Sequence, residues 1–166
     1  MPSRSAEHIE FKAYQSGFAE ETVAMWRLSF QRAMGLPEHN EPEDFNQQLQ
    51  FFAQIPAANI SLAVDRRVTK IAGLLVQAEA EIEQLYIHPD YQGLGLGQGF
   101  MAIAKQNSPR GLSLYTFAAN TRAQAFYVRQ GFVEIGRGVA DAEHNPWATD
   151  PAQLADIRYQ WQPAAG

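Results

Sequence analysis

Four glycines at every second position make the stretch around residue 95 the most informative part of the sequence. Gly93, Gly95, Gly97 and Gly99 follow the apolar-rich run Leu85–Ile87 and lead into a segment with helical spacing. Such a loop presents bare backbone N–H groups, and a helix N-terminus adds about half a positive charge, so the natural occupant is a phosphate or pyrophosphate. Glycines kept only for packing would cost roughly 0.8–1.0 kcal/mol each in a helix, which favours the functional interpretation.

Two other phosphate-binding loops do not fit this stretch. The dinucleotide fingerprint requires a third glycine three residues after the second, but Gln98 stands three residues after Gly95, and Phe100 stands three after Gly97. A Walker-type loop ends in Gly-Lys-Ser or Gly-Lys-Thr, and the sequence contains neither tripeptide. Both nucleotide-binding interpretations are therefore rejected.

A second motif lies downstream of the glycines. Its pattern is Asn-x-x-Ala-x-x-Phe-Tyr-x-x-x-Gly-Phe, formed by Asn120, Ala123, Phe126, Tyr127, Gly131 and Phe132. Together with Ile87-His88-Pro89 and the run Gln92 to Gly97, it resembles the GNAT superfamily of acyl-CoA-dependent N-acetyltransferases. The motifs that carry the resemblance are confined to about residues 81–132, and the N-terminal helices and the tail after Gly136 are not diagnostic.

The resemblance implies that the co-substrate is acetyl-CoA. Backbone amides of the glycine loop would hold the pyrophosphate, and Leu85, Tyr86 and Ile87 would pair with the pantetheine arm like an added strand. The loop residues expected to bind the cofactor are Gln92, Gly93, Leu94, Gly95, Leu96, Gly97 and Gln98. Asn120 and Phe126 are expected near the CoA, with a helix N-cap as the alternative role of Asn120 and core packing as that of Phe126.

Tyr127 is the candidate general acid, through the motif that it shares with the family. A phenol of pKa about 10 can donate to the thiolate that leaves when an amine displaces CoA. Tyr127 lies on one helical face with Ala123 and Phe126, so a half-buried core tyrosine is the alternative interpretation. No protein nucleophile is required, because the amine attacks directly in a ternary complex.

Glu81 and Glu83 are the candidate bases. An alkyl ammonium is neutral in only about one molecule in 2,500 at pH 7, so the attacking amine needs a base or a water path. The two carboxylates stand two residues apart on one strand and project to the same face, with Glu81 ranked first; the alternative is a solvated strand face. His39, His88 and His144 are expected on the surface, and with no ligand-spaced histidine pair, no metal site is predicted.

The predicted function is acetyl transfer from acetyl-CoA to a primary amine, on a small molecule or a peptide. The alternative is a non-catalytic acyl-CoA-binding regulatory or sensor module with the same fold. The stretch from Leu36 to Gln50 contains four carboxylates and no Lys or Arg, and in the resembled fold it borders the acceptor entrance. This stretch favours a cationic amine, although a solvated loop and helix start explain it equally well.

The elements that must position these residues follow from hydrophobic periodicity. Strands are predicted at 8–14, 60–64, 68–78, 81–87, 112–117, 132–136 and 157–161, and helices at 19–34, 41–55, 97–106 and 121–130. The order β-α-α-β-β-β-α-β-α-β-β predicts an α/β (α+β) fold. Its GNAT-like form is a mixed, mainly antiparallel central sheet of about six to seven strands flanked by four helices.

Length, composition and charge set the remaining expectations. The 166 residues predict a single domain over 1–166, with 46% apolar residues that argue against disorder. A formal charge of −5 is the wrong sign for nucleic-acid binding, and no apolar run is long enough to cross a membrane. Neither a nucleic acid nor a membrane is therefore expected as a partner. With no cysteine and no apolar N-terminal signal, a cytoplasmic location is predicted, and the resemblance adds a homodimer as a partner to consider.

Overall fold

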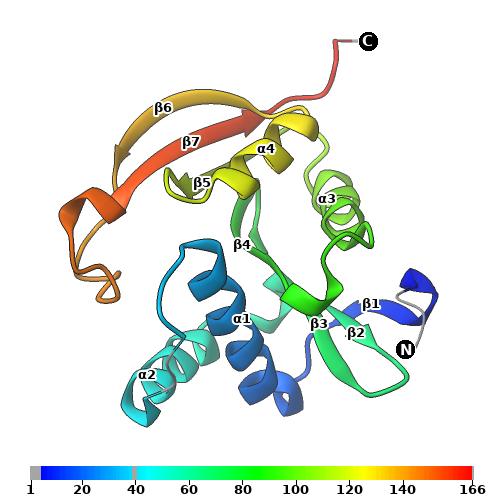
Figure 1. Ribbon diagram of the computed structural model, residues 1–166. Helices are drawn as coiled ribbons and strands as arrows, with labels where there is room; N and C mark the ends of the chain where they lie inside the picture. The colour runs from blue at the N-terminus through cyan, green and yellow to red at the C-terminus, as the bar shows by residue number, and fades with distance from the viewer. Residues whose placement is uncertain (1–4, 39–40, 166) are drawn as a thin grey trace. The chain divides into compact units, whose positions relative to one another are not determined.

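The computed structural model describes residues 5–38 and 41–165, and Figure 1 labels its helices and strands. Four α-helices are present: α1 (Ala19–Ala33), α2 (Pro42–Ala53), α3 (Leu96–Asn107) and α4 (Thr121–Arg129). Seven strands are present: β1 (Ile9–Ala13), β2 (Ile60–Asp65), β3 (Lys70–Ala78), β4 (Glu81–Ile87), β5 (Leu112–Phe117), β6 (Val133–Val139) and β7 (Ala155–Trp161). The short 3-10 helix η4 (Pro89–Tyr91) connects β4 to α3.

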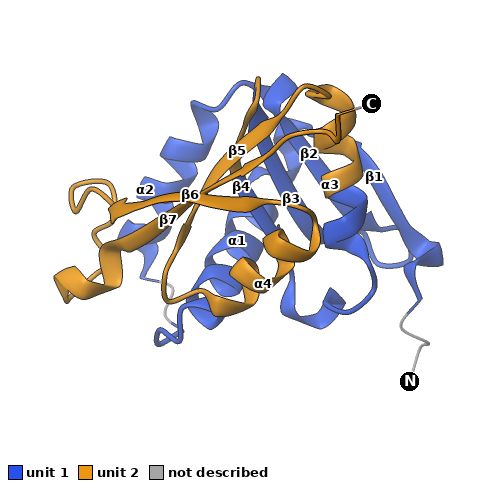
Figure 2. Ribbon diagram, turned by 90° about the horizontal axis from the view of Figure 1, so that it is seen from above, with its two compact units in different colours: residues 1–78, 84–100 blue, residues 79–83, 101–166 orange. Residues whose placement is uncertain are grey.

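The chain forms two compact units, shown in different colours in Figure 2. Unit 1 comprises residues 1–78 and 84–100, and unit 2 comprises residues 79–83 and 101–166. The boundary falls twice inside an element, because both β4 and α3 contribute residues to each unit. Hydrogen-bonded strands follow the order β1-β2-β3-β4-β5-β7-β6.

Unit 1 is built on antiparallel pairing and a covering pair of helices. β1 pairs with β2 from Ile9↔Asp65 to Ala13↔Ser61, and β2 pairs with β3. α1 places an apolar residue on one face every three or four positions, which buries that face against the sheet. The core of this unit contains Val23, Met25, Trp26, Phe52, Ile60, Leu62, Val64, Ile71, Leu74 and Val76.

Unit 2 combines one short parallel pairing with a long antiparallel ladder. The first residues of β4 pair in parallel with β5 through Glu81↔Ser113 and Ile82↔Leu114. β7 pairs antiparallel with β5 on one side and with β6 on the other, and β6 and β7 run side by side in Figure 1. Alternate residues of β5 and β7 are buried, among them Leu112, Leu114, Ile157 and Tyr159.

The fold class and the element order predicted from the sequence are confirmed. β3 begins at Lys70 rather than at Val68, because Thr69 has a φ of 51° and closes a turn that leaves Val68 65% exposed. β6 extends beyond its predicted end at Gly136 to Val139, and all seven of its residues are exposed. The alternation that predicted a buried face in β1 was also misleading, since Phe11 is 37% exposed and contacts Phe100 by its edge.

Two further properties concern the described part of the chain. None of its helices combines the length and the apolar character needed to cross a membrane. Residues 5–38 and 41–165 contain no group of three or more His, Cys, Asp or Glu side chains arranged to hold a metal ion.

Candidate active site

In unit 1, the glycine-rich turn between η4 and α3 has the conformation that its sequence predicts. Gly93 and Gly95 both have a φ of +80°, in the left-handed region that L side chains rarely adopt. A Cβ at Gly93 would meet nothing within 4 Å, and one at Gly95 would meet only the Gln98 Oε1 atom, at 4.0 Å. The two glycines are therefore required by backbone conformation, and the space beside them is open.

The first amides of α3 lie directly after these glycines. The first backbone hydrogen bond of the helix runs from Gly99 N to Gly95 O, at 3.0 Å. The N–H groups of Leu96, Gly97 and Gln98 precede that bond, so the helix offers them no acceptor. Three amides at a helix N-terminus, next to an open glycine backbone, form the donor arrangement that suits an anionic phosphate group.

The end of β4 has one edge directed away from β3. The backbone N–H of His88 donates to Ala72 O of β3 at 2.8 Å, so by the alternation of a β-ladder Leu85 and Ile87 direct their main-chain groups to the opposite edge. The Ile87 carbonyl already accepts bonds from Ser29 Oγ at 3.1 Å and from Gln92 Nε2 at 3.4 Å. Within residues 5–38 and 41–165, the groups left open on this edge are those of Leu85 and the N–H of Ile87.

Tyr86 lies on the same strand, but its side chain packs against the hydrophobic core of unit 1. Its ring packs edge-on against Phe30 of α1, with 6.2 Å between the ring centroids. Burial raises the pKa of the Tyr86 phenol. The sequence grouped Tyr86 with its neighbours as a cofactor-binding residue, and its placement assigns the side chain to packing.

In unit 2, the second motif forms α4 and the turn after it. Asn120 is the N-cap of α4, since its Oδ1 accepts the Ala123 N–H at 3.2 Å, and the residue is only 9% exposed. Tyr127 is 7% exposed, and its ring contacts those of Phe126, Phe132 and Tyr159. The cap and the aromatic cluster both have structural roles, while the chemical roles of Asn120, Phe126 and Tyr127 stay predictions.

The two candidate bases have different surroundings, also within unit 2. An oxygen of the Glu81 carboxylate lies 3.4 Å from Arg158 Nη2, and the Arg158 guanidinium lies 4.5 Å above the Tyr115 ring. Glu83 is exposed. The sequence offered no sign of the Glu81–Arg158 pair, because its members are 77 residues apart.

Asp156 is a carboxylate that the sequence interpretation missed. It lies on β7 opposite Phe117 of β5, is partly buried, and forms no hydrogen bond or ion pair with another residue of the described ranges through its side chain. Burial raises the pKa of Asp156. The only available signal was its position directly before the strand predicted at 157–161, which gave no indication of burial.

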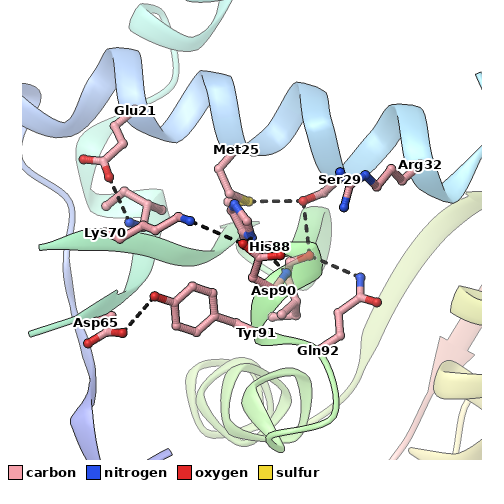
Figure 3. Close-up of polar contacts among 12 residues, drawn as sticks. Glu21, Met25, Ser29, Arg32, Asp65, Lys70, His88, Asp90, Tyr91 and Gln92 are labelled. Atoms are coloured by element: carbon pink, nitrogen blue, oxygen red, sulfur yellow. Dashed lines mark hydrogen bonds and ion pairs between the residues drawn. The ribbon is translucent and has the colours of Figure 1, made fainter. Parts of the chain in front are cut away.

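His88 was expected on the surface, and that expectation is wrong. The side chain is 7% exposed, and its Nδ1 accepts the Asp90 N–H at 3.0 Å. Figure 3 shows the polar contacts around it, including the Tyr91 hydroxyl, which donates to Asp65 at 2.8 Å. His144 is exposed as expected, and His39 lies outside the described residues.

Known proteins share this combination of fold and motifs. The family model described as "Acetyltransferase (GNAT) domain" matches residues 56–134, which include both motifs. Residues 56–134 of the chain therefore match the GNAT acetyltransferase family. The comparisons support an N-acetyltransferase whose acceptor is an amine, and they do not favour the non-catalytic module.

Three individual relatives illustrate the similarity. Peptidyl-lysine N-acetyltransferase YjaB of Salmonella typhimurium is 27% identical over 128 residues, which are 77% of this chain and 86% of that protein. The solution structure of apo YjaB from Escherichia coli has a TM-score of 0.70 at 22% identity, covering 92% of this chain and 97% of the other. PaiA N-acetyltransferase of Thermoplasma acidophilum, in complex with coenzyme A, has a TM-score of 0.61 at 18% identity, covering 93% and 99%.

Proposed function

We propose that this GNAT enzyme transfers the acetyl group of acetyl-CoA to the side-chain amine of a lysine in a peptide or protein. The observation that carries the donor assignment is the pair of left-handed glycines, Gly93 and Gly95, directly before the first amides of α3. The PaiA relative was solved with coenzyme A, and the YjaB relatives are named as peptidyl-lysine N-acetyltransferases, which supports the donor and the acceptor respectively.

The donor would be held mainly by main-chain groups of unit 1. The amides of Leu96, Gly97 and Gln98 would bind the pyrophosphate, with Gln92, Gly93, Leu94 and Gly95 shaping the loop. Leu85 and the Ile87 N–H would bond the amides of the pantetheine arm as a neighbouring strand does. No Lys or Arg occurs between residues 84 and 104, so backbone amides and the helix dipole would provide the local attraction for phosphate.

In the transfer step, the neutral acceptor amine attacks the carbonyl carbon of the thioester. A C–N bond forms, the C–S bond breaks, and the sulfur leaves as a thiolate. The hydroxyl of Tyr127 would donate its proton to that sulfur or stabilise it by a hydrogen bond. The attacking nitrogen would lose one proton, to the phenolate or to water, as the amide forms, so that the products are the N-acetylated amine and CoA. Asn120 and Phe126 would contribute to the donor site from the same helix.

The acceptor arrives as an ammonium and must lose a proton to a base. Glu81 is the first candidate of the sequence analysis, but Arg158 Nη2 lies 3.4 Å from its carboxylate and would compete with an incoming ammonium for it. Glu83 is exposed to water, which favours a relay through solvent. Asp156 is a third candidate, because its carboxylate has no cationic partner among the described residues and its raised pKa makes it a better proton acceptor.

The test measures acetyl-CoA affinity by calorimetry and thiol release with a lysine-containing peptide. Wild type should bind acetyl-CoA and release CoA only when the amine is present. Tyr127→Phe should lower kcat by about 10²–10⁴-fold with little change in affinity, the range typical of a lost general acid. Tyr159→Phe, in the same aromatic cluster, is the matched control and should retain activity.

Three outcomes would contradict parts of this proposal. If the protein bound acetyl-CoA but released no CoA with any amine, the non-catalytic sensor module would be favoured. If Tyr127→Phe kept wild-type turnover, the role of Tyr127 would be limited to core packing. For Glu81→Gln, Glu83→Gln and Asp156→Asn, kcat/KM is measured as a function of pH. The base is the residue whose replacement abolishes the increase of kcat/KM with rising pH. If all three variants retain that increase, none of the three residues is the base.

A further inference from the structure

The His88 imidazole forms the side-chain cap of the turn that leads into the glycine loop. The Nδ1 atom of His88 accepts the Asp90 N–H at 3.0 Å (Figure 3). The main-chain carbonyl of His88 accepts the Tyr91 N–H at 2.8 Å. Both N–H groups at the start of η4 are thus bound by one residue. This is the arrangement that an Asn or Asp side chain provides at a turn, with a ring nitrogen in place of the carboxamide oxygen.

The cap works only while Nδ1 carries no proton, which places the proton of the neutral ring on Nε2. Protonation of Nδ1 would set two donors against each other, because the Asp90 N–H also points at that atom. The Asp90 carboxylate could accept the new N–H, but its Oδ2 lies 3.9 Å from Nδ1, which is beyond hydrogen-bond distance. The charged ring would therefore have to move, or the turn would.

The charged groups around His88 come from four elements. Lys70 of β3 and Arg32 of α1 oppose a positive charge on the ring, and Asp90 of η4 favours one. The Tyr91 ring lies edge-on at 5.7 Å, with its hydroxyl bonded to Asp65 of β2. Burial is the largest effect, and together with Lys70 it lowers the pKa of His88, so the capping form is the stable one at neutral pH.

The turn is joined directly to the donor loop. Tyr91 is fixed to Asp65 at 2.8 Å, and Gln92 Nε2 reaches the Ile87 carbonyl at 3.4 Å. The left-handed residue Gly93 follows at once, and the amides of α3 begin at Leu96. A change at η4 would therefore be passed to the start of the loop through the main chain.

We infer that neutral His88 is a positioning residue for the donor loop, so that affinity for acetyl-CoA falls when this imidazole is protonated. The inference rests on the proposed function only in taking acetyl-CoA as the donor. The sign follows from the cap. Because the pKa of His88 lies below the ordinary histidine value of about 6.5, the cap is intact at neutral pH and is lost as the pH falls through that lowered pKa.

The experiment compares wild type with His88→Asn and His88→Ala by calorimetry of acetyl-CoA binding between pH 5 and 8. Asn keeps a cap acceptor but cannot be protonated, so His88→Asn should bind like wild type at pH 8. Below the pKa of His88, wild-type Kd should rise by up to about tenfold per pH unit relative to His88→Asn. His88→Ala should bind weakly at every pH. The phosphates of the ligand titrate equally for all three proteins, so the difference between profiles isolates His88.

A second measurement does not depend on the donor. In the ligand-free protein, the amide resonances of Asp90 to Gly95 should follow the titration of the His88 ring in wild type and stay constant in His88→Asn. Equal Kd profiles for wild type and His88→Asn, or amides that ignore the ring titration, would overturn the inference. If wild type bound no acetyl-CoA at any pH, the proposed function would fail, and the amide titration would still decide the role of His88.

Discussion

Replacement of Gly95 by alanine tests whether the left-handed backbone of the loop serves donor binding. The added Cβ would meet only Gln98 Oε1, at 4.0 Å, so no collision accompanies the change. The effect must come from the φ of +80°, which costs an L residue roughly 1–2 kcal/mol. Because Gly95 is exposed and the space around it is open, the free variant should relax to a negative φ.

Binding would then have to restore the strained conformation. A cost of about 1–2 kcal/mol corresponds to a rise in the Kd for acetyl-CoA of about 5–30-fold. The same relaxation predicts that the free energy of unfolding changes by less than about 1 kcal/mol. Calorimetry gives the affinity, and urea denaturation gives the stability.

Gly136→Ala is the matched control, because it makes the same chemical change in β6, where an added Cβ meets nothing within 4 Å. This variant should keep the wild-type affinity. An unchanged Kd for Gly95→Ala in a folded protein would refute the reasoning, since the left-handed conformation would then be unnecessary for holding the donor. A rise of equal size in Gly136→Ala would show that the effect is not local to the loop.

Three further perturbations test other features of the structure. Asp65→Asn should lower the free energy of unfolding by about 1.5–3 kcal/mol at pH 7. Hydrogen bonding, above all from Arg67, lowers the pKa of Asp65 to about 2, so the difference in unfolding free energy between the variant and wild type, measured by denaturation, should shrink as the pH falls from 4 towards 2. In Gly99→Ala the new Cβ would lie 2.5 Å from Phe11 Cζ, which should cost about 1–3 kcal/mol, and a double-mutant cycle with Phe11→Leu should show partial recovery; additive effects would contradict the contact. The triple variant Glu41→Gln/Glu43→Gln/Asp44→Asn removes three exposed carboxylates at the start of α2, whereas Glu38 is already paired with Arg32 at 2.6 Å. Its kcat/KM for a cationic peptide should fall and depend less on salt, and equal salt dependence in the two proteins would remove these residues from acceptor selection.

The sequence predicted the elements well because the decisive signals were local. Helical spacing before Gly35 and Pro37 predicted α1, and a proline at the first turn predicted α2. The alternating glycines predicted the donor loop for the same reason, since a left-handed φ is a property of single residues. Thr69 was missed because a non-glycine residue with a φ of 51° leaves no trace in hydrophobic periodicity.

The surroundings of the candidate site could not be predicted, because they depend on contacts between distant parts of the chain. Asp65 and Tyr91 are 26 residues apart, and Ser29 and Ile87 are 58 apart. Burial of His88 results from α1, β3 and η4 meeting at one point, which no pattern within a single segment records. The same holds for Asp156, whose pKa depends on how deeply the start of β7 is buried.

The bond between Tyr91 and Asp65 has a consequence for engineering of the chain. A short exposed connection such as residues 66–69, between β2 and β3, is normally the preferred place for new termini or an inserted reporter peptide. Here Arg67 at the tip binds Asp65 through two side-chain bonds and one main-chain bond, and Asp65 in turn holds the tyrosine that precedes the glycine loop. A circular permutant opened at this hairpin would therefore fold with a loosened donor loop, whereas one opened in the exposed 141–144 segment between β6 and β7 would leave it intact.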